Sequence, residues 1–149
     1  MLKKRFKINW VLNNELAIGL PPSKIKHLNN LKDNGFKSIL SLCSEDEVKL
    51  PDNIDQIFIH KRYVLPDHKT GKLPSTGEIN NVLDLIKTII NKGPLYIHCF
   101  AAVERSPLIC MAWLVKEHKI TPKQSLEYMM QVNPGTSPLP SQYKLLQGI

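Results

Sequence analysis

A cysteine and an arginine separated by five residues, Cys99 and Arg105, form the pair in this sequence best suited to phosphate chemistry. A cysteine thiolate is a strong nucleophile, and the planar guanidinium of arginine donates two parallel hydrogen bonds to phosphoryl oxygens. An apolar stretch over residues 95–97 precedes the cysteine, and Pro107 lies where a helix is expected to begin. The pattern therefore predicts a buried strand, an anion-binding loop and a helix in succession.

The loop over residues 99–105, called the phosphate loop below, is expected to bind phosphate mainly through its backbone. Amide groups of a loop that leads into a helix N-terminus point inward, and the helix dipole favours negative charge there. The same field favours the thiolate form of the cysteine. The predicted phosphate-binding residues are Phe100, Ala101, Ala102, Val103, Glu104 and Arg105.

The motif His98-Cys99-x5-Arg105-Ser106 resembles the signature of the cysteine-dependent protein tyrosine phosphatases, and the length of 149 residues matches their small dual-specificity branch. Residues 31–42 are similar to a helix and strand early in these domains, and Pro66-Asp67-His68 resembles their acid loop. Pro140-Ser141-Gln142 resembles a segment of the phosphatase-and-tensin lipid phosphatases and of related mitochondrial lipid phosphatases. The resemblance extends over most of the chain.

The resemblance implies a two-step mechanism with a covalent intermediate. Cys99 attacks phosphorus and forms a cysteinyl-phosphate, while Arg105 and the loop amides hold the equatorial oxygens. Asp67 protonates the leaving oxygen and then acts as the base for the water that hydrolyses the intermediate. No metal and no organic cofactor is expected, because the loop and its arginine supply the positive charge.

Four further residues receive supporting roles from the same resemblance. Ser106 assists departure of the thiolate, and His98 orients the loop from behind. Gln142 positions the water, with capping of the final helix as the competing role. Cys43 lies in a segment similar to one whose cysteine forms a reversible disulfide with the nucleophile, so it is a candidate redox partner of Cys99. Simple burial of Cys43 in the core is the competing interpretation.

Two residues of the phosphate loop depart from the family pattern. Ala102 stands where glycine is usual, and a positive φ there would cost an alanine about 1 kcal/mol. Glu104 places a carboxylate in an anion-binding loop, which opposes phosphate binding unless the side chain points outward or is protonated. Myotubularin-type phosphatases carry an aspartate at the matching position, so one hypothesis is that Glu104 shares the proton-donor role of Asp67.

Phosphotyrosine, with phosphoserine and phosphothreonine, in proteins is the predicted substrate, because so short a chain lacks the segments that deepen the pocket of receptor-type enzymes. An anionic phospholipid is the alternative, although Phe100 and Val103 stand where inositide phosphatases place lysines. An RNA 5′-triphosphatase is a third alternative. Ala102 and Glu104 favour a further alternative, a phosphate-binding module without turnover. A sulfurtransferase or an arsenate reductase also uses a cysteine in an anion-binding loop, but Asp67 and Ser106 fit phosphoryl transfer better.

The composition of the chain limits the partners and the cellular compartment that we expect for it. The net charge is +7, but only three of the 20 basic residues are arginines, so no nucleic-acid partner is expected. Three widely spaced cysteines argue against a disulfide framework or zinc finger and favour a reducing compartment. No signal peptide is expected, and no stretch approaches the roughly 20 apolar residues of a transmembrane helix. We therefore expect a cytoplasmic monomer.

The elements that must position these residues alternate between strands and helices, which indicates an α/β fold. We expect one domain over residues 1–149, like a dual-specificity phosphatase, with a central, mostly parallel sheet of about five strands flanked by helices. The predicted strands are 6–11, 15–19, 37–42, 55–60 and 94–98, and the predicted helices are 23–34, 76–92, 107–118, 122–132 and 141–147.

Overall fold

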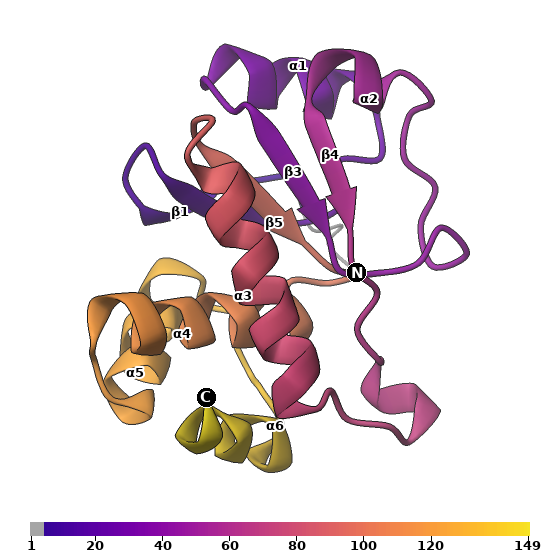
Figure 1. Cartoon of the computed structure of the whole chain (residues 1–149). Coiled ribbons are helices and arrows are strands. Elements are labelled where there is room, and N and C mark those ends of the chain that lie inside the picture. The colour runs from indigo at the N-terminus through magenta and orange to yellow at the C-terminus, as the bar shows by residue number, and fades with distance from the viewer. Residues whose placement is uncertain (1–4) are drawn as a thin grey trace.

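A five-stranded sheet forms the centre of the computed structural model, which describes residues 5–149 (Figure 1). Its strands are β1 (Asn9–Leu12), β2 (Leu16–Gly19), β3 (Ser38–Ser41), β4 (Ile59–Arg62) and β5 (Leu95–His98), in the spatial order β1-β2-β5-β3-β4. β1 pairs antiparallel with β2, and the other pairings are parallel. The predicted α/β class with a mostly parallel sheet of about five strands is confirmed.

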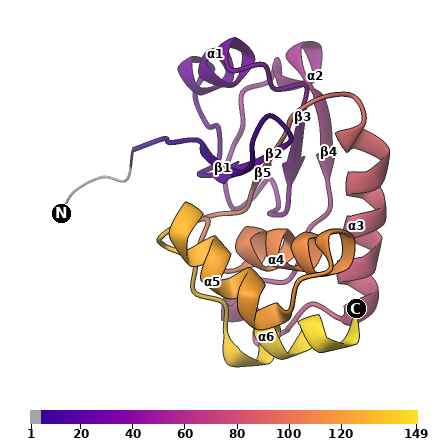
Figure 2. The ribbon, with the colours of Figure 1, turned by 90° about the vertical axis from the view of Figure 1, so that its left-hand side faces the viewer.

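Helices cover both faces of the sheet, because successive side chains of each strand point to opposite faces. Leu95 and Ile97 pack into a core with α3 (Thr76–Ile90), α4 (Arg105–His118) and α5 (Pro122–Val132). Tyr96 between them packs against α1 (Ile25–Asp33) and α2 (Ile54–Ile57). The chain ends with α6 (Pro140–Leu145), and 3-10 turns cover His68–Thr70 and Leu146–Gly148. Figure 2 shows α4, α5 and α6 grouped on one side of the sheet, away from α1 and α2.

The parallel strands bring their carboxyl ends to one edge of the sheet. Ser41 at the end of β3 pairs with His98 of β5 on one side and with Arg62 of β4 on the other. Gly19 of β2 also pairs with His98. The segments that leave these strands therefore start side by side, which places the phosphate loop near the chain that follows β3 and β4.

A capping box fixes the start of α3, as predicted from the sequence. The Glu78 N–H donates to Ser75 Oγ at 3.0 Å, and the Glu78 carboxylate accepts from the Ser75 N–H at 3.0 Å. The two bonds satisfy backbone groups that have no partner within the helix. The long helix that follows returns the chain to β5.

The strand predicted over residues 55–60 is wrong at its start, because α2 occupies Ile54–Ile57 and β4 runs over Ile59–Arg62. Ile54 and Phe58, four residues apart, both pack on the α1 side of the sheet. That spacing is helical, and the apolar run at 57–59 obscured it. The other differences are smaller: β1 is shorter than 6–11, and α4 begins at Arg105 rather than at Pro107.

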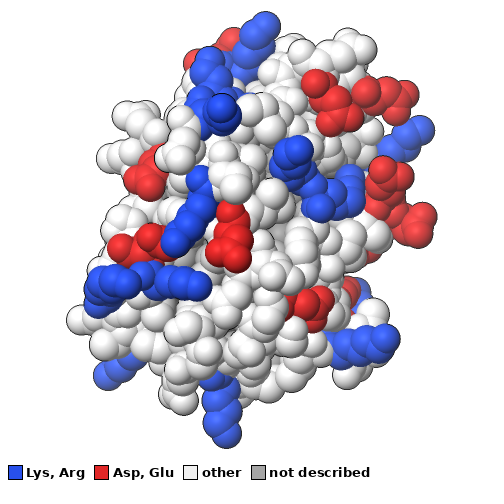
Figure 3. Space-filling model, viewed as in Figure 1, with Lys and Arg blue, Asp and Glu red and all other residues white. Residues whose placement is uncertain are grey.

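Charged side chains of both signs are interspersed on the face shown in Figure 3. The net charge of +7 is therefore not gathered into one continuous basic region on this face. Over residues 5–149, no helix has the combination of length and apolar character needed to cross a membrane.

Candidate active site

The phosphate loop connects β5 to α4, in the predicted order of strand, loop and helix. Cys99 follows directly after β5 and is buried, and its Sγ lies 3.2 Å from the hydroxyl oxygen of Ser106. Ser106 is buried in the first turn of α4, and the Glu104 carbonyl accepts the helix's first hydrogen bond from the Leu108 N–H at 2.9 Å. The hydroxyl can therefore donate a hydrogen bond to a thiolate at Cys99.

The loop turns sharply at Ala102, whose φ is +56°. The positive φ that the sequence allowed for this position is confirmed, with the strain it brings to an alanine. The Asn133 side-chain amide donates to the Ala102 carbonyl and to Thr136 Oγ1, both at 3.0 Å. The Ser137 N–H also donates to the Val103 carbonyl at 2.8 Å. The segment after α5, predicted only as a loop, thus holds the strained turn by hydrogen bonds to its carbonyls.

Arg105 is held by a carboxylate that the sequence did not single out. Its two terminal nitrogens donate to the two carboxylate oxygens of Glu47 at 3.1 and 2.6 Å, and it also donates to the Leu65 carbonyl at 3.2 Å. Burial is the largest single influence and lowers the pKa of Arg105, but the Glu47 hydrogen bond and the nearby negative charges of Glu47, Cys99 and Asp67 together outweigh it, so the net pKa is raised. The same bond is the main reason that the pKa of Glu47 is lowered. The pair fixes the guanidinium in a charged state.

His98 lies behind the loop in a chain of hydrogen bonds. Its Nδ1 lies 3.0 Å from the Cys99 carbonyl, which can only accept, so Nδ1 carries the proton. Its Nε2 accepts from the Ser41 hydroxyl at 2.6 Å, and Ser41 Oγ lies 2.8 Å from Nε2 of His60. Burial is the main cause that lowers the pKa of His98 to about 4. A neutral, fully bonded ring suits the predicted orienting role, and Ser41 and His60 are partners that the sequence did not reveal.

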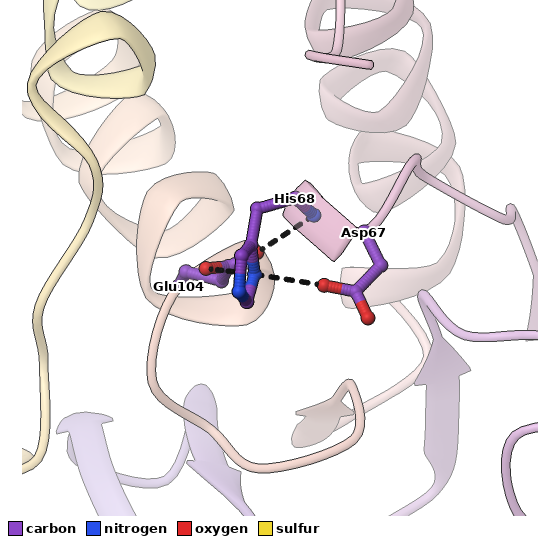
Figure 4. Close-up of side chains that lie close together, drawn as sticks. All are labelled: Asp67, His68 and Glu104. Atoms are coloured by element: carbon purple, nitrogen blue, oxygen red, sulfur yellow. Dashed lines mark hydrogen bonds and ion pairs between the residues drawn. The ribbon is translucent and has the colours of Figure 1, made fainter. Parts of the chain in front are cut away.

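Asp67 and His68 face the phosphate loop across a pocket of about 240 Å³, which Cys99, Phe100 and Arg105 also line. His68 Nδ1 lies 2.9 Å from Asp67 Oδ1 and 2.8 Å from Glu104 Oε2 (Figure 4). The structure therefore brings the predicted acid, nucleophile and arginine to one pocket. The side chain of Glu104 also lines this pocket and is turned toward His68 on the opposite loop.

Asp67, His68 and Glu104 also place three possible metal-ligand atoms within 4.8 Å of one another. The His68 ring nitrogen already contacts both carboxylates, so hydrogen bonds alone account for the arrangement. No step of the mechanism below depends on a metal at these residues.

Gln142 and Cys43 are the two remaining residues for which the sequence predicted a role. Gln142 is buried and accepts from the Leu139 N–H at 2.8 Å, so it caps the final helix, and its Nε2 lacks a hydrogen-bond partner within residues 5–149. Cys43 is buried as a free thiol, with Sγ 3.9 Å from His98 Nδ1. Burial raises the pKa of Cys43 to about 11. The water-positioning role of Gln142 and the redox role of Cys43 stay predictions.

Comparison with known proteins gives relatives of two kinds. The chain is 32% identical over 82 residues to dual specificity protein phosphatase 5 of Rattus norvegicus, which covers 54% of this chain and 21% of that protein. It is 22% identical over 147 residues to phosphatidylglycerophosphate phosphatase PTPMT2 of Arabidopsis thaliana, which covers 98% of this chain and 64% of that protein. The chain thus spans less than two thirds of either relative's length.

The fold itself has close counterparts among solved structures. The crystal structure of Tk-PTP in the active form matches with a TM-score of 0.82 at 17% identity, over 95% of this chain and 94% of that chain. A family model described as the dual specificity phosphatase catalytic domain matches residues 21–147, which include every element of the site. On this match, the chain belongs to the dual specificity phosphatase catalytic-domain family.

Proposed function

We propose that the chain hydrolyses phosphate monoesters through a cysteinyl-phosphate on Cys99. The observation that carries the proposal is the shared pocket of Cys99, Arg105 and Asp67, with the Ser106 hydroxyl 3.2 Å from the nucleophilic sulfur. A nucleophile, an anion-binding group and an acid thus surround one small volume. The family membership supports the same reaction class.

The reaction proceeds in two displacements at phosphorus. In the first, the bond from Cys99 Sγ to phosphorus forms as the bond to the ester oxygen breaks, and the proton of Asp67 passes to that oxygen. In the second, a water oxygen attacks phosphorus, its proton passes to Asp67, and the sulfur leaves as a thiolate. Ser106 stabilises that thiolate by donating its hydroxyl hydrogen, and the loop amides and Arg105 stabilise the equatorial oxygens throughout.

Phosphotyrosine in proteins, with phosphoserine and phosphothreonine, is the substrate class we propose. Phe100 at the rim of the pocket is half exposed and offers an apolar surface to an aromatic leaving group. The three free cysteines suit a reducing compartment, and we propose a cytoplasmic monomer.

A phospholipid monoester is the second candidate, favoured by one specific observation. The match to a relative named phosphatidylglycerophosphate phosphatase covers 98% of this chain, far more than the match to dual specificity protein phosphatase 5. A phosphate-binding module without turnover is the third candidate, and the strain at Ala102 favours it.

The test begins with hydrolysis of p-nitrophenyl phosphate between pH 5 and 8 by the wild type, Cys99→Ser and Asp67→Asn under reducing conditions. We expect turnover that Cys99→Ser abolishes. A wild type that binds phosphate without turnover supports the binding module instead. Phosphotyrosine and phosphoserine peptides are then compared with phosphatidylglycerophosphate in vesicles, and the larger kcat/KM assigns the substrate class.

A further inference from the structure

Glu104 belongs to the phosphate loop, but its carboxylate is engaged outside it (Figure 4). Oε2 lies 2.8 Å from His68 Nδ1, and Oε1 accepts from the His68 backbone N–H at 3.3 Å. The side chain is 12% exposed, so little of it is in contact with solvent. A carboxylate with both oxygens bound to the opposite loop is not arranged to donate to a phosphate ester.

The contacts of Glu104 join two loops that face each other across the pocket. We call residues 66–72 the acid loop. In the part of the chain that the structure describes, each hydrogen bond or ion pair between the acid loop and residues 99–106 has Glu104 as one partner. The other bonds of the acid loop are internal, such as those from Thr70 to the Asp67 carbonyl. Loss of the Glu104 side chain therefore removes the hydrogen bonds that hold the acid loop itself to the phosphate loop, and leaves the bond from Arg105 to the Leu65 carbonyl directly before it.

His68 transmits this attachment to Asp67. The ring nitrogen that contacts Glu104 also lies 2.9 Å from Asp67 Oδ1, so one nitrogen stands between two carboxylate oxygens. A single N–H can be shared by both acceptors. With the ring fixed by Glu104, the direction of the neighbouring Asp67 carboxylate is fixed as well.

We propose that Glu104 and His68 are positioning residues that hold Asp67 in place to protonate the leaving group. The inference rests on the proposed function, in which Asp67 is the acid. It assigns Glu104 a part in the proton-transfer step rather than in phosphate binding. The carboxylate of Glu104 in the phosphate loop then serves to hold the acid loop in position.

The test separates proton transfer from phosphate binding by varying the leaving group. General acid catalysis typically contributes about 10²–10⁴-fold, and it matters most when the leaving oxygen is strongly basic. We compare the burst phase of product release from two substrates: phenol from phenyl phosphate, and p-nitrophenol from p-nitrophenyl phosphate. Glu104→Ala and His68→Ala should lose on the order of 10–100-fold with phenyl phosphate but only a few-fold with p-nitrophenyl phosphate. Inhibition by inorganic phosphate should be unchanged or tighter in Glu104→Ala, because a negative charge is removed.

A double variant and two controls complete the design. Glu104→Ala combined with Asp67→Asn should be no slower than Asp67→Asn alone, because the positioned acid is already absent. Glu127→Ala, which removes an exposed carboxylate of α5, should match the wild type with both substrates. Glu104→Gln keeps an acceptor for the His68 N–H and should recover part of the loss. Thermal melts of each variant exclude misfolding as the cause.

Three results would overturn the inference. Equal losses with both leaving groups would show that Glu104 supports the loop in general and not the acid. If the loss of activity in the double variant equals the product of the losses in the two single variants, Glu104 acts independently of Asp67. Full activity of Asp67→Asn together with loss in Glu104→Gln would make Glu104 the proton donor itself. Failure of the proposed function is distinguishable from all three, because the wild type would then release no phenol.

Discussion

Replacement of Glu47 by alanine tests whether its carboxylate is what holds the arginine of the phosphate loop. The side chain of Arg105 is only 2% exposed, and Glu47 accepts hydrogen bonds from both terminal nitrogens of its guanidinium. Without Glu47, the acceptors that remain are the carbonyls of Leu65 at 3.2 Å and Leu42 at 3.5 Å. A buried positive charge would then lack its counter-charge.

The loss of folding stability expected for Glu47→Ala follows from how deeply Arg105 and Glu47 are each buried. Breaking a fully buried ion pair from one side typically costs about 3–5 kcal/mol. Glu47 is 25% exposed, so solvent screens part of the interaction, and we reduce the expected loss to about 1–3 kcal/mol. For a chain of this size, 1 kcal/mol corresponds to roughly 2–4 °C in Tm, which gives a fall of roughly 2–12 °C.

The same pair predicts a dependence of stability on pH. The Arg105 hydrogen bond is the main cause that lowers the pKa of Glu47 below its ordinary value of 4.5. For a carboxyl group with a lowered pKa in the folded state, the added stability is present above the unfolded pKa and is lost as pH falls through the folded pKa. The wild type should therefore lose stability below about pH 4.5, and Glu47→Gln should lose less over the same range.

Urea unfolding of the wild type, Glu47→Ala, Glu47→Gln and Glu127→Ala at pH 7 and at pH 4 measures both effects. Glu127→Ala removes an exposed carboxylate and should lie within about 0.5 kcal/mol of the wild type. Turnover of Glu47→Ala should fall by about tenfold or more, because Arg105 is no longer oriented. If Glu47→Ala is as stable as Glu127→Ala at pH 7, water satisfies Arg105 and the reasoning from burial is wrong.

Three further predictions follow from other contacts. Ala102→Gly relieves a positive φ and should change the free energy of unfolding by no more than about 1 kcal/mol in either direction. The control Ala112→Gly, inside α4, should lose about 1 kcal/mol or more, and urea unfolding measures both variants. Ser41→Ala removes the hydroxyl that partners Nε2 of both His60 and His98 and should cost roughly 1–3 kcal/mol by the same measurement. Mild peroxide should produce a Cys43–Cys99 disulfide in peptide maps, and inactivation without that peptide would reject the redox hypothesis.

Local patterns in the sequence were enough to predict the centre of the site. Cys99 and Arg105 are tied to their places by the strand before them and the helix after them, so a linear motif contains the needed information. The capping residues of α3 act over three positions and were predicted for the same reason. The start of β4 was misplaced because apolar residues at 57–59 fit a strand as well as the end of a short helix.

Contacts between distant segments were not predictable in this way. Glu47 is one of three acidic residues in a row of four, and nothing in the row indicates which of them reaches Arg105, 58 positions away. Asn133 looks like an ordinary loop residue, yet it binds the carbonyl of Ala102 across 31 positions. The sequence left open whether Glu104 points outward or is protonated, and its partner His68 became apparent only in the fold.

The attachment of the phosphate loop to residues 133–137 has a consequence for inhibition. Asn133 and Ser137, which are not among the residues that line the pocket, hold the loop by the carbonyls of Ala102 and Val103. A compound that competes for these two carbonyls would relax the strained turn without occupying the substrate's place. Substrate at any concentration would not displace such a compound directly, and its selectivity would depend on an asparagine and a serine outside the motif that all Cys-x5-Arg enzymes share.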